Sequence, residues 1–310
     1  MWIIDHYRRE YWGSMKIQDM KWHEVEVKGI LSPKNGMNLY RGCQHGCIYC
    51  YARSTCYQMK HAFEDIEVKA NAITLFEKSL KSKRQSCMIG TGAMSDPYIP
   101  LELKYGHMRK SLELIERYGY GVAIQTKSDL ILRDLDILKK INQKTKCVVQ
   151  MTLTTYDEAL CKIIEPHVAT TKRRVEVLNI MRDAGIPTVV WLDPILPFIN
   201  DTKENLEGIM SYCNEAKVYG VLCFGFGLTL REGNREYFYQ KLDEHFPGLK
   251  EEYIKRYGNA YEVNSPHNRE LMQNFKALCK AYHIKSDMRE IFRYMHTYEQ
   301  KEYQQLRLDI

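Results

Sequence analysis

The sequence predicts an α/β fold: a partial (β/α)6 barrel of the TIM type, followed by a helical C-terminal extension. Two observations predict it. Short apolar runs alternate with amphipathic helical patterns from about residue 38 to 228, and beyond Gly227 the sequence becomes charged, tyrosine-rich and helix-like. Strands covered by helices on both faces are apolar nearly throughout, as these runs are. Right-handed strand–helix–strand units repeated about six times open out or curl into a barrel.

Six runs rich in Val, Ile and Leu are the expected parallel strands. They are Asn38–Arg41, Cys87–Gly90, Val122–Thr126, Val148–Leu153, Thr188–Leu192 and Val221–Phe226. The segments between them place apolar residues at helical spacing, and these are Ala70–Lys83, His107–Tyr118, Asp134–Ile141, Arg174–Ala184 and Asn205–Val218. We expect Gly185 to follow the end of the fourth helix and Asp201 to cap the start of the fifth.

The pattern divides the chain into three regions. We expect residues 1–30 to pack on the barrel, residues 31–230 to form the barrel, and residues 231–310 to form a helical extension that caps one face of it. No Gly/Ser-rich linker precedes the last region, so we do not expect it to be an independent domain.

Composition and charge exclude several classes of protein. Of the 310 residues, 45% are apolar and 27% charged, as in an ordinary folded protein. The net charge of +6 is too weak for a nucleic-acid footprint, so nucleic acid is a possible but not a favoured partner. The first residues are too charged for a signal peptide, and no run approaches the roughly 18 apolar residues of a membrane helix. We expect a cytoplasmic protein with no membrane partner.

Three of the ten cysteines form a tight group directly after the first expected strand. Cys43, Cys47 and Cys50 have the spacing C-x₃-C-x₂-C, which brings three sulfurs onto one short loop. Disulfides rarely persist in a reducing compartment, so such a group indicates a metal or catalysis. Thiolates hold iron–sulfur clusters, and three ligands leave one iron of a cubane open.

Other uses of these cysteines stay open. A mononuclear zinc site needs a fourth ligand, for which the candidates are His45, Cys56 and His61. A thioredoxin-like pair of Cys47 and Cys50 leaves Cys43 unexplained, and haem attachment needs a histidine where Tyr51 stands. A non-enzymatic iron–sulfur or zinc protein is therefore an alternative. Outside such a site, we expect Cys56 to be a buried, small apolar residue.

The cysteine motif, with aromatic Tyr49 just before its last member, resembles the signature of the radical S-adenosylmethionine (SAM) superfamily. The longer string from Cys43 to Arg53 resembles the spore photoproduct lyase-like branch, also labelled DNA repair photolyase-like. Three more stretches are similar to that branch: Ser95–Glu102, Thr126–Asp134, and Glu165–Pro166 before Arg174.

The resemblance implies a 4Fe–4S cluster on Cys43, Cys47 and Cys50, with SAM bound to the open iron. Reductive cleavage of SAM in this superfamily gives a 5′-deoxyadenosyl radical, which would here act on an unknown substrate. An electron donor such as flavodoxin or ferredoxin is an implied partner. A nucleic-acid repair or modification enzyme of the lyase type is the alternative.

The resemblance also implies which residues bind the cofactor. The candidates are Tyr49 beside the adenine, Thr91 and Gly92 at the end of the second strand, Ser95 and Asp96 at the same rim, Lys127 for the SAM carboxylate, and Thr152 and Asp193 for ribose or substrate. Ordinary packing of Tyr49, an Asp-Pro turn at Asp96 and a surface position for Lys127 are the alternatives. We expect Arg133–Asp134 and Glu165–Arg174 to be structural ion pairs.

One position departs from the lyase pattern. Lyases of this type carry a hydrogen-donating cysteine near the end of the second strand, two residues before a serine. Here Ala93 stands two residues before Ser95, and Cys87 falls within the expected strand. Reversal of thymine dimers is therefore not expected.

Overall fold

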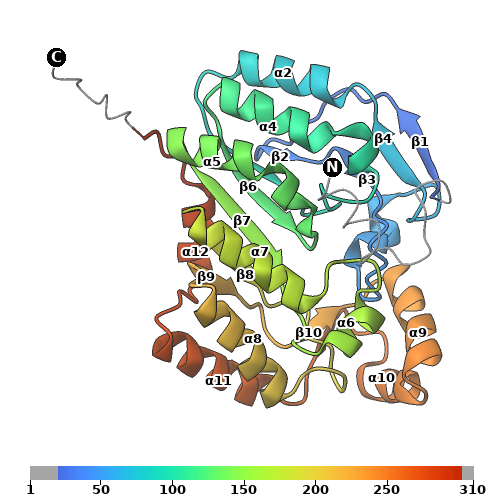
Figure 1. Cartoon of the computed structure of the whole chain (residues 1–310). Coiled ribbons are helices and arrows are strands. Elements are labelled where there is room, and N and C mark those ends of the chain that lie inside the picture. The colour runs from blue at the N-terminus through green and yellow to red at the C-terminus, as the bar shows by residue number, and fades with distance from the viewer. Residues whose placement is uncertain (1–19, 302–310) are drawn as a thin grey trace, which may run out of the picture.

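A six-stranded parallel sheet forms the centre of the computed structural model, in the strand order β2-β5-β6-β7-β8-β9. The structure describes residues 20–301, so most of the region 1–30 predicted to pack on the barrel lies outside the described residues. Figure 1 shows helices α2, α4, α5, α7 and α8 following one another along the outer side of this sheet. This is the predicted partial TIM-type α/β fold.

The elements follow each other in a regular order. The strands are β1 (Trp22–Val25), β2 (Gly36–Met37), β3 (Tyr40–Arg41), β4 (Ile66–Lys69), β5 (Met88–Thr91), β6 (Gly121–Thr126), β7 (Cys147–Thr152), β8 (Thr188–Trp191), β9 (Gly220–Leu222), β10 (Gly227–Thr229) and β11 (Glu262–Asn264). The α-helices are α2 (Ala72–Ser82), α3 (Glu102–Tyr105), α4 (His107–Arg117), α5 (Leu135–Lys144), α6 (Glu158–Ile164), α7 (Thr171–Asp183), α8 (Lys203–Glu215), α9 (Asn234–His245), α10 (Leu249–Tyr257), α11 (Asn268–Ala281) and α12 (Met288–His296). Short 3₁₀ helices span Tyr51–Arg53, Thr55–Tyr57 and Asp129–Asp134.

The strands are apolar because both of their faces are covered. In β6, Val122 and Ile124 pack in the large core under the helices, whereas Ala123 between them packs in a smaller cluster with residues of α12. Side chains alternate between the two faces of a strand, so successive residues of one apolar run pack in two different cores. This explains why the expected strands β5 to β9 were found at their positions to within a few residues.

The first expected strand was wrong. The sheet edge is β2, which pairs in parallel with β5, whereas Tyr40–Arg41 is a separate strand, β3, in a second sheet of order β1-β4-β3. Leu39 and Tyr40 are as buried as Met37, so the apolar run does not reveal that the chain changes sheets.

The cap of α8 was also misplaced by one residue. Thr202 caps the helix by accepting a hydrogen bond from the backbone N–H of Asn205 (3.1 Å). The carboxylate of Asp201 instead accepts from the hydroxyl of Ser265, which joins this loop to the C-terminal region. Asp and Thr are both good caps, so residue type alone does not choose between neighbours.

The C-terminal region contributes to the centre of the molecule at two places. Its strand β11 pairs antiparallel with β10, across the boundary expected at residue 230, which itself stays a prediction. Helix α12 buries Ile291 and Met295 against the inner side of the sheet, where they meet the following residues: Met88, Ala123, Val148, Val189 and Leu222. In the described part of the chain, no helix has the length and apolar character needed to cross a membrane.

Replacing Ile291 by Ala should destabilise the protein by about 2–5 kcal/mol, because it empties a fully buried position between α12 and the sheet. Met288→Ala on the same helix, where the side chain is 37% exposed, should cost less than about 0.5 kcal/mol. Urea denaturation measures both values. Equal effects of the two substitutions would show that α12 does not support the sheet.

Candidate active site

The three cysteines lie on the loop that leaves β3, and this loop is fastened to its surroundings through backbone groups. Gly42 has φ +90°, and a Cβ there would lie 2.5 Å from the carbonyl oxygen of Phe63. The N–H of Cys43 donates to that same carbonyl at 3.3 Å. The hydroxyl of Ser95, after β5, donates to the carbonyl of Gly42 at 2.6 Å. These backbone hydrogen bonds fix the position of Cys43. They require glycine at residue 42, because a side chain there would clash with Phe63.

All three thiols line one cavity of about 560 Å³. Burial raises the pKa of Cys43 to about 12 and also raises the pKa values of Cys47 and Cys50, so the thiols are neutral until a cation compensates them. Within residues 20–301 they do not form a group close enough to share a single metal ion. In a cubane each cysteine binds a different iron, so this wider arrangement suits a cluster better than mononuclear zinc.

Asp96 joins the cysteine side of the cavity to the end of β6. Its carboxylate accepts hydrogen bonds from the Thr126 hydroxyl (2.8 Å) and from the backbone N–H groups of Lys127 (2.8 Å) and Tyr98 (2.8 Å). The Nδ1 atom of His45 lies 3.5 Å away. The side-chain oxygens of Asp96 and Ser95 are therefore hydrogen-bonded to other parts of the chain. In this structure the two residues position the cysteine loop and the end of β6.

Lys127 is a cation at the cavity wall. Burial opposes its charge, but the neighbouring Cys47, Glu165 and Cys50 raise the pKa of Lys127 above its ordinary value. Its Nζ atom lies 5.8 Å from the centre of the Tyr49 ring, and it makes no hydrogen bond or ion pair with another residue of the described chain. It can therefore meet an anionic group in the cavity.

A buried ion pair stands behind Tyr49. The guanidinium of Arg174 contacts the carboxylate of Glu165, and both side chains are fully buried. The Tyr49 hydroxyl donates to the same carboxylate, and Arg174 also donates to the carbonyl of Thr152 (2.7 Å). Burial alone would raise the pKa of Glu165, but Arg174 and Lys127 hold it below its ordinary value. The expected ion pair Glu165–Arg174 is confirmed, as is Arg133–Asp134 (2.8 Å).

Asp193 follows β8 and also faces the cavity. Burial raises the pKa of this carboxyl to about 7, while the charge of Lys127 acts in the opposite direction. Within residues 20–301, its carboxylate has no hydrogen-bond partner. It is thus a carboxyl group that can hold or release a proton near neutral pH.

The structure brings most of the predicted site residues to this one cavity. Its walls include Cys43, Cys47, Cys50, Tyr49, Gly92, Ser95, Asp96, Lys127, Thr152 and Asp193. Thr91 does not line it, because it ends β5 one residue too early. The backbone of the next residue, Gly92 (φ +101°), runs so close to β6 that a Cβ would lie 1.9 Å from the carbonyl oxygen of Gln125.

Several cavity residues were not predicted. They include Gln125, Trp191, Phe224, Arg231, Tyr261, Glu262 and Asn264. Gln125, a polar residue in an apolar strand, was a signal that could have been used. The residues on and beside β10 and β11 gave no such signal, because strands of three residues are too short to show an alternation of apolar and polar residues.

Cys56 corrects another expectation. It is exposed rather than buried, and its sulfur accepts a hydrogen bond from the guanidinium of Arg231 at 3.3 Å. A partner distant in sequence holds it at the surface, which the local pattern does not reveal.

Comparison with protein families decides what kind of cavity this is. Residues 37–213, from β2 to α8 and including the whole cysteine loop, match the Radical SAM superfamily. The chain belongs to the radical SAM superfamily. It is therefore a radical SAM enzyme, and membership implies the use of SAM and a 4Fe–4S cluster.

Related sequences and structures agree with this. The chain is 32% identical over 188 residues to the uncharacterised protein MJ0683 of Methanocaldococcus jannaschii, covering 58% of this chain and 70% of that protein. It is 27% identical over 289 residues to the uncharacterised protein Rv2578c of Mycobacterium tuberculosis, covering 86% and 82%. Spore photoproduct lyase in complex with a dinucleoside spore photoproduct has the same fold: TM-score 0.61, 16% identity, and coverage of 88% and 84%.

The stability of the cluster-free radical SAM protein should fall as the pH rises from about 4, the ordinary value for a carboxyl group, to about 7, the pKa of Asp193 in the folded protein. The folded pKa is raised, so the native state binds the proton more tightly and loses this advantage as the proton leaves, at up to about 1.4 kcal/mol per pH unit. Asp193→Asn should flatten this part of the profile in urea denaturation.

Asp183→Asn, at an exposed position on α7, is the matched control and should keep the slope. Parallel profiles for the wild type and Asp193→Asn would contradict the assignment.

Proposed function

We propose that this enzyme holds its 4Fe–4S cluster on Cys43, Cys47 and Cys50 and cleaves SAM reductively beside it. When bound, the cluster supplies the electron that breaks the C5′–S bond of SAM, giving a 5′-deoxyadenosyl radical that takes hydrogen from the substrate. The single observation that carries the proposal is the arrangement of the cavity: it is lined by three thiols too far apart for one ion and by the ammonium group of Lys127 near two of them.

The chain's own residues bind and orient the cosubstrate in this proposal. Lys127 pairs with the carboxylate of SAM, since it is a buried cation at the strand ends. Gly92 presents only backbone to the ligand, and the close approach of β6 keeps a side chain out of this position. Tyr49, whose hydroxyl donates to Glu165, forms part of the cavity wall beside the bound SAM.

The substrate occupies the outer half of the cavity, which is lined mainly from β8, β9 and the β10–β11 pair. Trp191 and Phe224 lie stacked there with ring centres 5.8 Å apart, and Phe224 is 54% exposed. Arg231 donates to the Tyr261 hydroxyl at 2.8 Å at the rim. We infer a substrate with a planar or apolar part and a polar group.

Repair of thymine dimers is not part of the proposal, although spore photoproduct lyase shares the fold. Ala93 lines the cavity where the lyase pattern has its cysteine, and its carbonyl accepts a hydrogen bond from Tyr51 (2.6 Å). Cys87 comes just before β5, at the opposite end of that strand from the cavity. The electron donor that we propose is a small redox protein, flavodoxin or ferredoxin.

After anaerobic reconstitution and chemical reduction, the protein should convert SAM to 5′-deoxyadenosine. Replacing Cys43, Cys47 or Cys50 by Ala should lower this activity and the iron content to the level of the cluster-free protein, because three ligands are the fewest that hold a cubane. Cys56→Ala, six residues beyond the last ligand, should keep both. Chromatography of the nucleoside and iron analysis provide the measurements. A fully loaded wild type that forms no 5′-deoxyadenosine would refute the proposal.

Lys127→Met should weaken SAM binding roughly 10–100-fold, the effect of losing a charge-assisted hydrogen bond of about 1.5–3 kcal/mol. Lys110→Met, at a lysine of α4 away from the cavity, should bind SAM as the wild type does. Equilibrium dialysis of the reconstituted proteins gives the dissociation constants. Unchanged binding by Lys127→Met, with iron content intact, speaks against the role given to this residue.

A further inference from the structure

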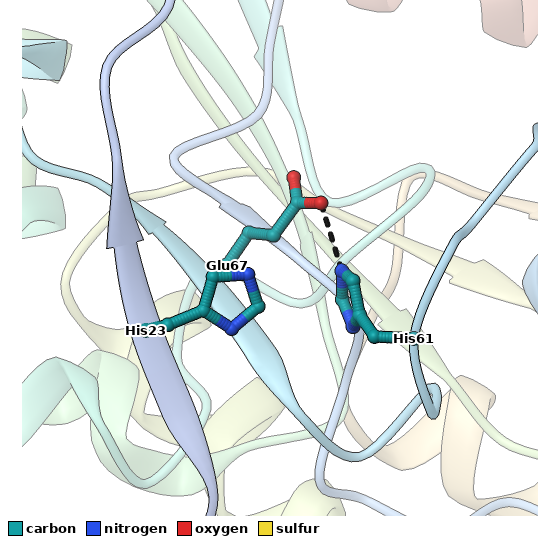
Figure 2. A group of neighbouring side chains, drawn as sticks. All are labelled: His23, His61 and Glu67. Atoms are coloured by element: carbon teal, nitrogen blue, oxygen red, sulfur yellow. Dashed lines mark hydrogen bonds and ion pairs between the residues drawn. The ribbon is translucent and has the colours of Figure 1, made fainter.

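A second group of metal-ligating side chains lies on the three-stranded sheet, outside the cavity of the cysteines. His23 is on β1, Glu67 is on β4, and His61 is on the loop before β4. Figure 2 shows the two imidazole rings and the carboxylate gathered around one small space. We propose that these three side chains bind a divalent transition-metal ion, for which zinc is the best fit.

The sheet register brings His23 and Glu67 together. They are direct partners in the parallel pair of β1 and β4, so their side chains leave the sheet on the same face. The neighbours of Glu67 in β4, Ile66 and Val68, are fully buried and fix which face that is. Glu67 must therefore point away from the core, toward the two histidines.

The distances suit an ion with little rearrangement. One ligand atom from each residue lies within 4.8 Å of the others, and this is the one such group of three among residues 20–301. Two ligands on a tetrahedral zinc ion, with bonds of about 2.0–2.1 Å, are about 3.3 Å apart. The side chains are 40% (His23), 18% (His61) and 17% (Glu67) exposed, so rotation of the side chains can close this gap and water can supply a fourth ligand.

Both imidazoles have an oxygen on the nitrogen that would not bind the metal. Nδ1 of His23 lies 3.0 Å from the carboxylate of Asp65, and Nδ1 of His61 lies 3.0 Å from the carbonyl oxygen of Ala62. Metal-binding histidines usually donate their other N–H to a carboxylate or a carbonyl, which fixes the tautomer and the ring orientation. In both residues this leaves Nε2 as the ligand atom.

The contact between His61 and Glu67 suits a cation when Nδ1 of His61 donates to the carbonyl of Ala62. A carbonyl can only accept, so Nδ1 of His61 carries a hydrogen, and Nε2 of the neutral ring is an acceptor. This Nε2 atom lies 2.8 Å from a carboxylate oxygen, which is also an acceptor. In this tautomer a proton or a metal ion lies between them, and the imidazole of His23 beside them favours the metal.

Among the described residues, Arg41 and Lys69 are positive charges that oppose the site. The guanidinium of Arg41 lies 3.9 Å from the other oxygen of Glu67 and is held by the carbonyls of Tyr57 and Gln58. The carboxylates of Glu67 and Asp65 balance these two charges, so a divalent ion would not enter a positively charged surrounding. Arg41 also orients Glu67 so that the first oxygen faces the histidines.

The ion would stabilise the segment that contacts the first cysteine of the active site. Phe63 lies between His61 and Asp65, and its carbonyl accepts the hydrogen bond from the N–H of Cys43. An ion joining β1, this loop and β4 fixes the segment on which the first cysteine rests. We therefore assign it a structural role.

The test is a titration of the full chain with Zn²⁺, after its cluster has been reconstituted so that the cavity cysteines are occupied. Competition with a chromophoric chelator should give one zinc per chain. His23→Ala and His61→Ala should each weaken binding at least about tenfold, and Asp65→Asn by about 10–100-fold, as expected for an outer partner of a ligand. His245→Ala, which removes a histidine lying 3.8 Å from Glu244, is the matched control and should bind as the wild type does.

Two further readouts separate the ion from a structural effect of the substitutions. Zn²⁺ should raise the melting temperature of the wild type and of His245→Ala but not of His23→Ala or His61→Ala, whose circular dichroism spectra should match that of the wild type. Bound Co²⁺ should show the weak visible bands of nitrogen and oxygen ligands without a thiolate charge-transfer band. A wild type that binds no zinc, or binding unchanged in both histidine variants, would overturn the proposal and leave a proton between His61 and Glu67.

Discussion

The hydrogen bonds of Ser95 and Asp96 are the constraint on which the active site depends. Ser95 holds the start of the cysteine loop, and Asp96 holds the end of β6 and the backbone of Lys127. Two adjacent residues after β5 thus fix both the sulfur side and the cation side of one cavity. Because buried polar groups are costly when left unpaired, each of these bonds also penalises any other arrangement of the loop.

Charge balance explains why so many ionisable groups can be buried here. Lys127 and Arg174 provide two positive charges, and Glu165 provides one negative charge close to both. The ammonium group of Lys127 lies near Cys47 and Cys50, whose thiols become anionic only when they bind metal. In the proposed holoenzyme, Lys127 stabilises these thiolates, and the protein provides this charge before the metal arrives.

How far the sequence predicts the structure depends on the range of the interactions. Apolar runs predicted strands β5 to β9, because a strand buried on both faces has apolar residues at nearly every position of a short segment. The cysteine spacing likewise predicted the metal side of the cavity. Lys127, Thr152 and Asp193 were predicted to lie there because ligands bind where parallel strands end, and all three line the cavity. The change of sheets at Leu39, the exposed position of Cys56 and the pairing of β10 with β11 depend on partners far along the chain. No local pattern contains that information.

The pairing of β10 with β11 has a consequence for the chemistry. One wall of the reaction chamber is built from residues 261–264, which come long after the barrel strands are complete. Loss of the residues beyond 230 would open that wall to bulk water and would also remove Phe238 and Tyr253, which belong to the same core cluster as Cys47 and Tyr49. Reactive species quenched by solvent need enclosure, so the segment that follows the barrel acts as a shield for the radical as well as a surface for selecting what reacts with it.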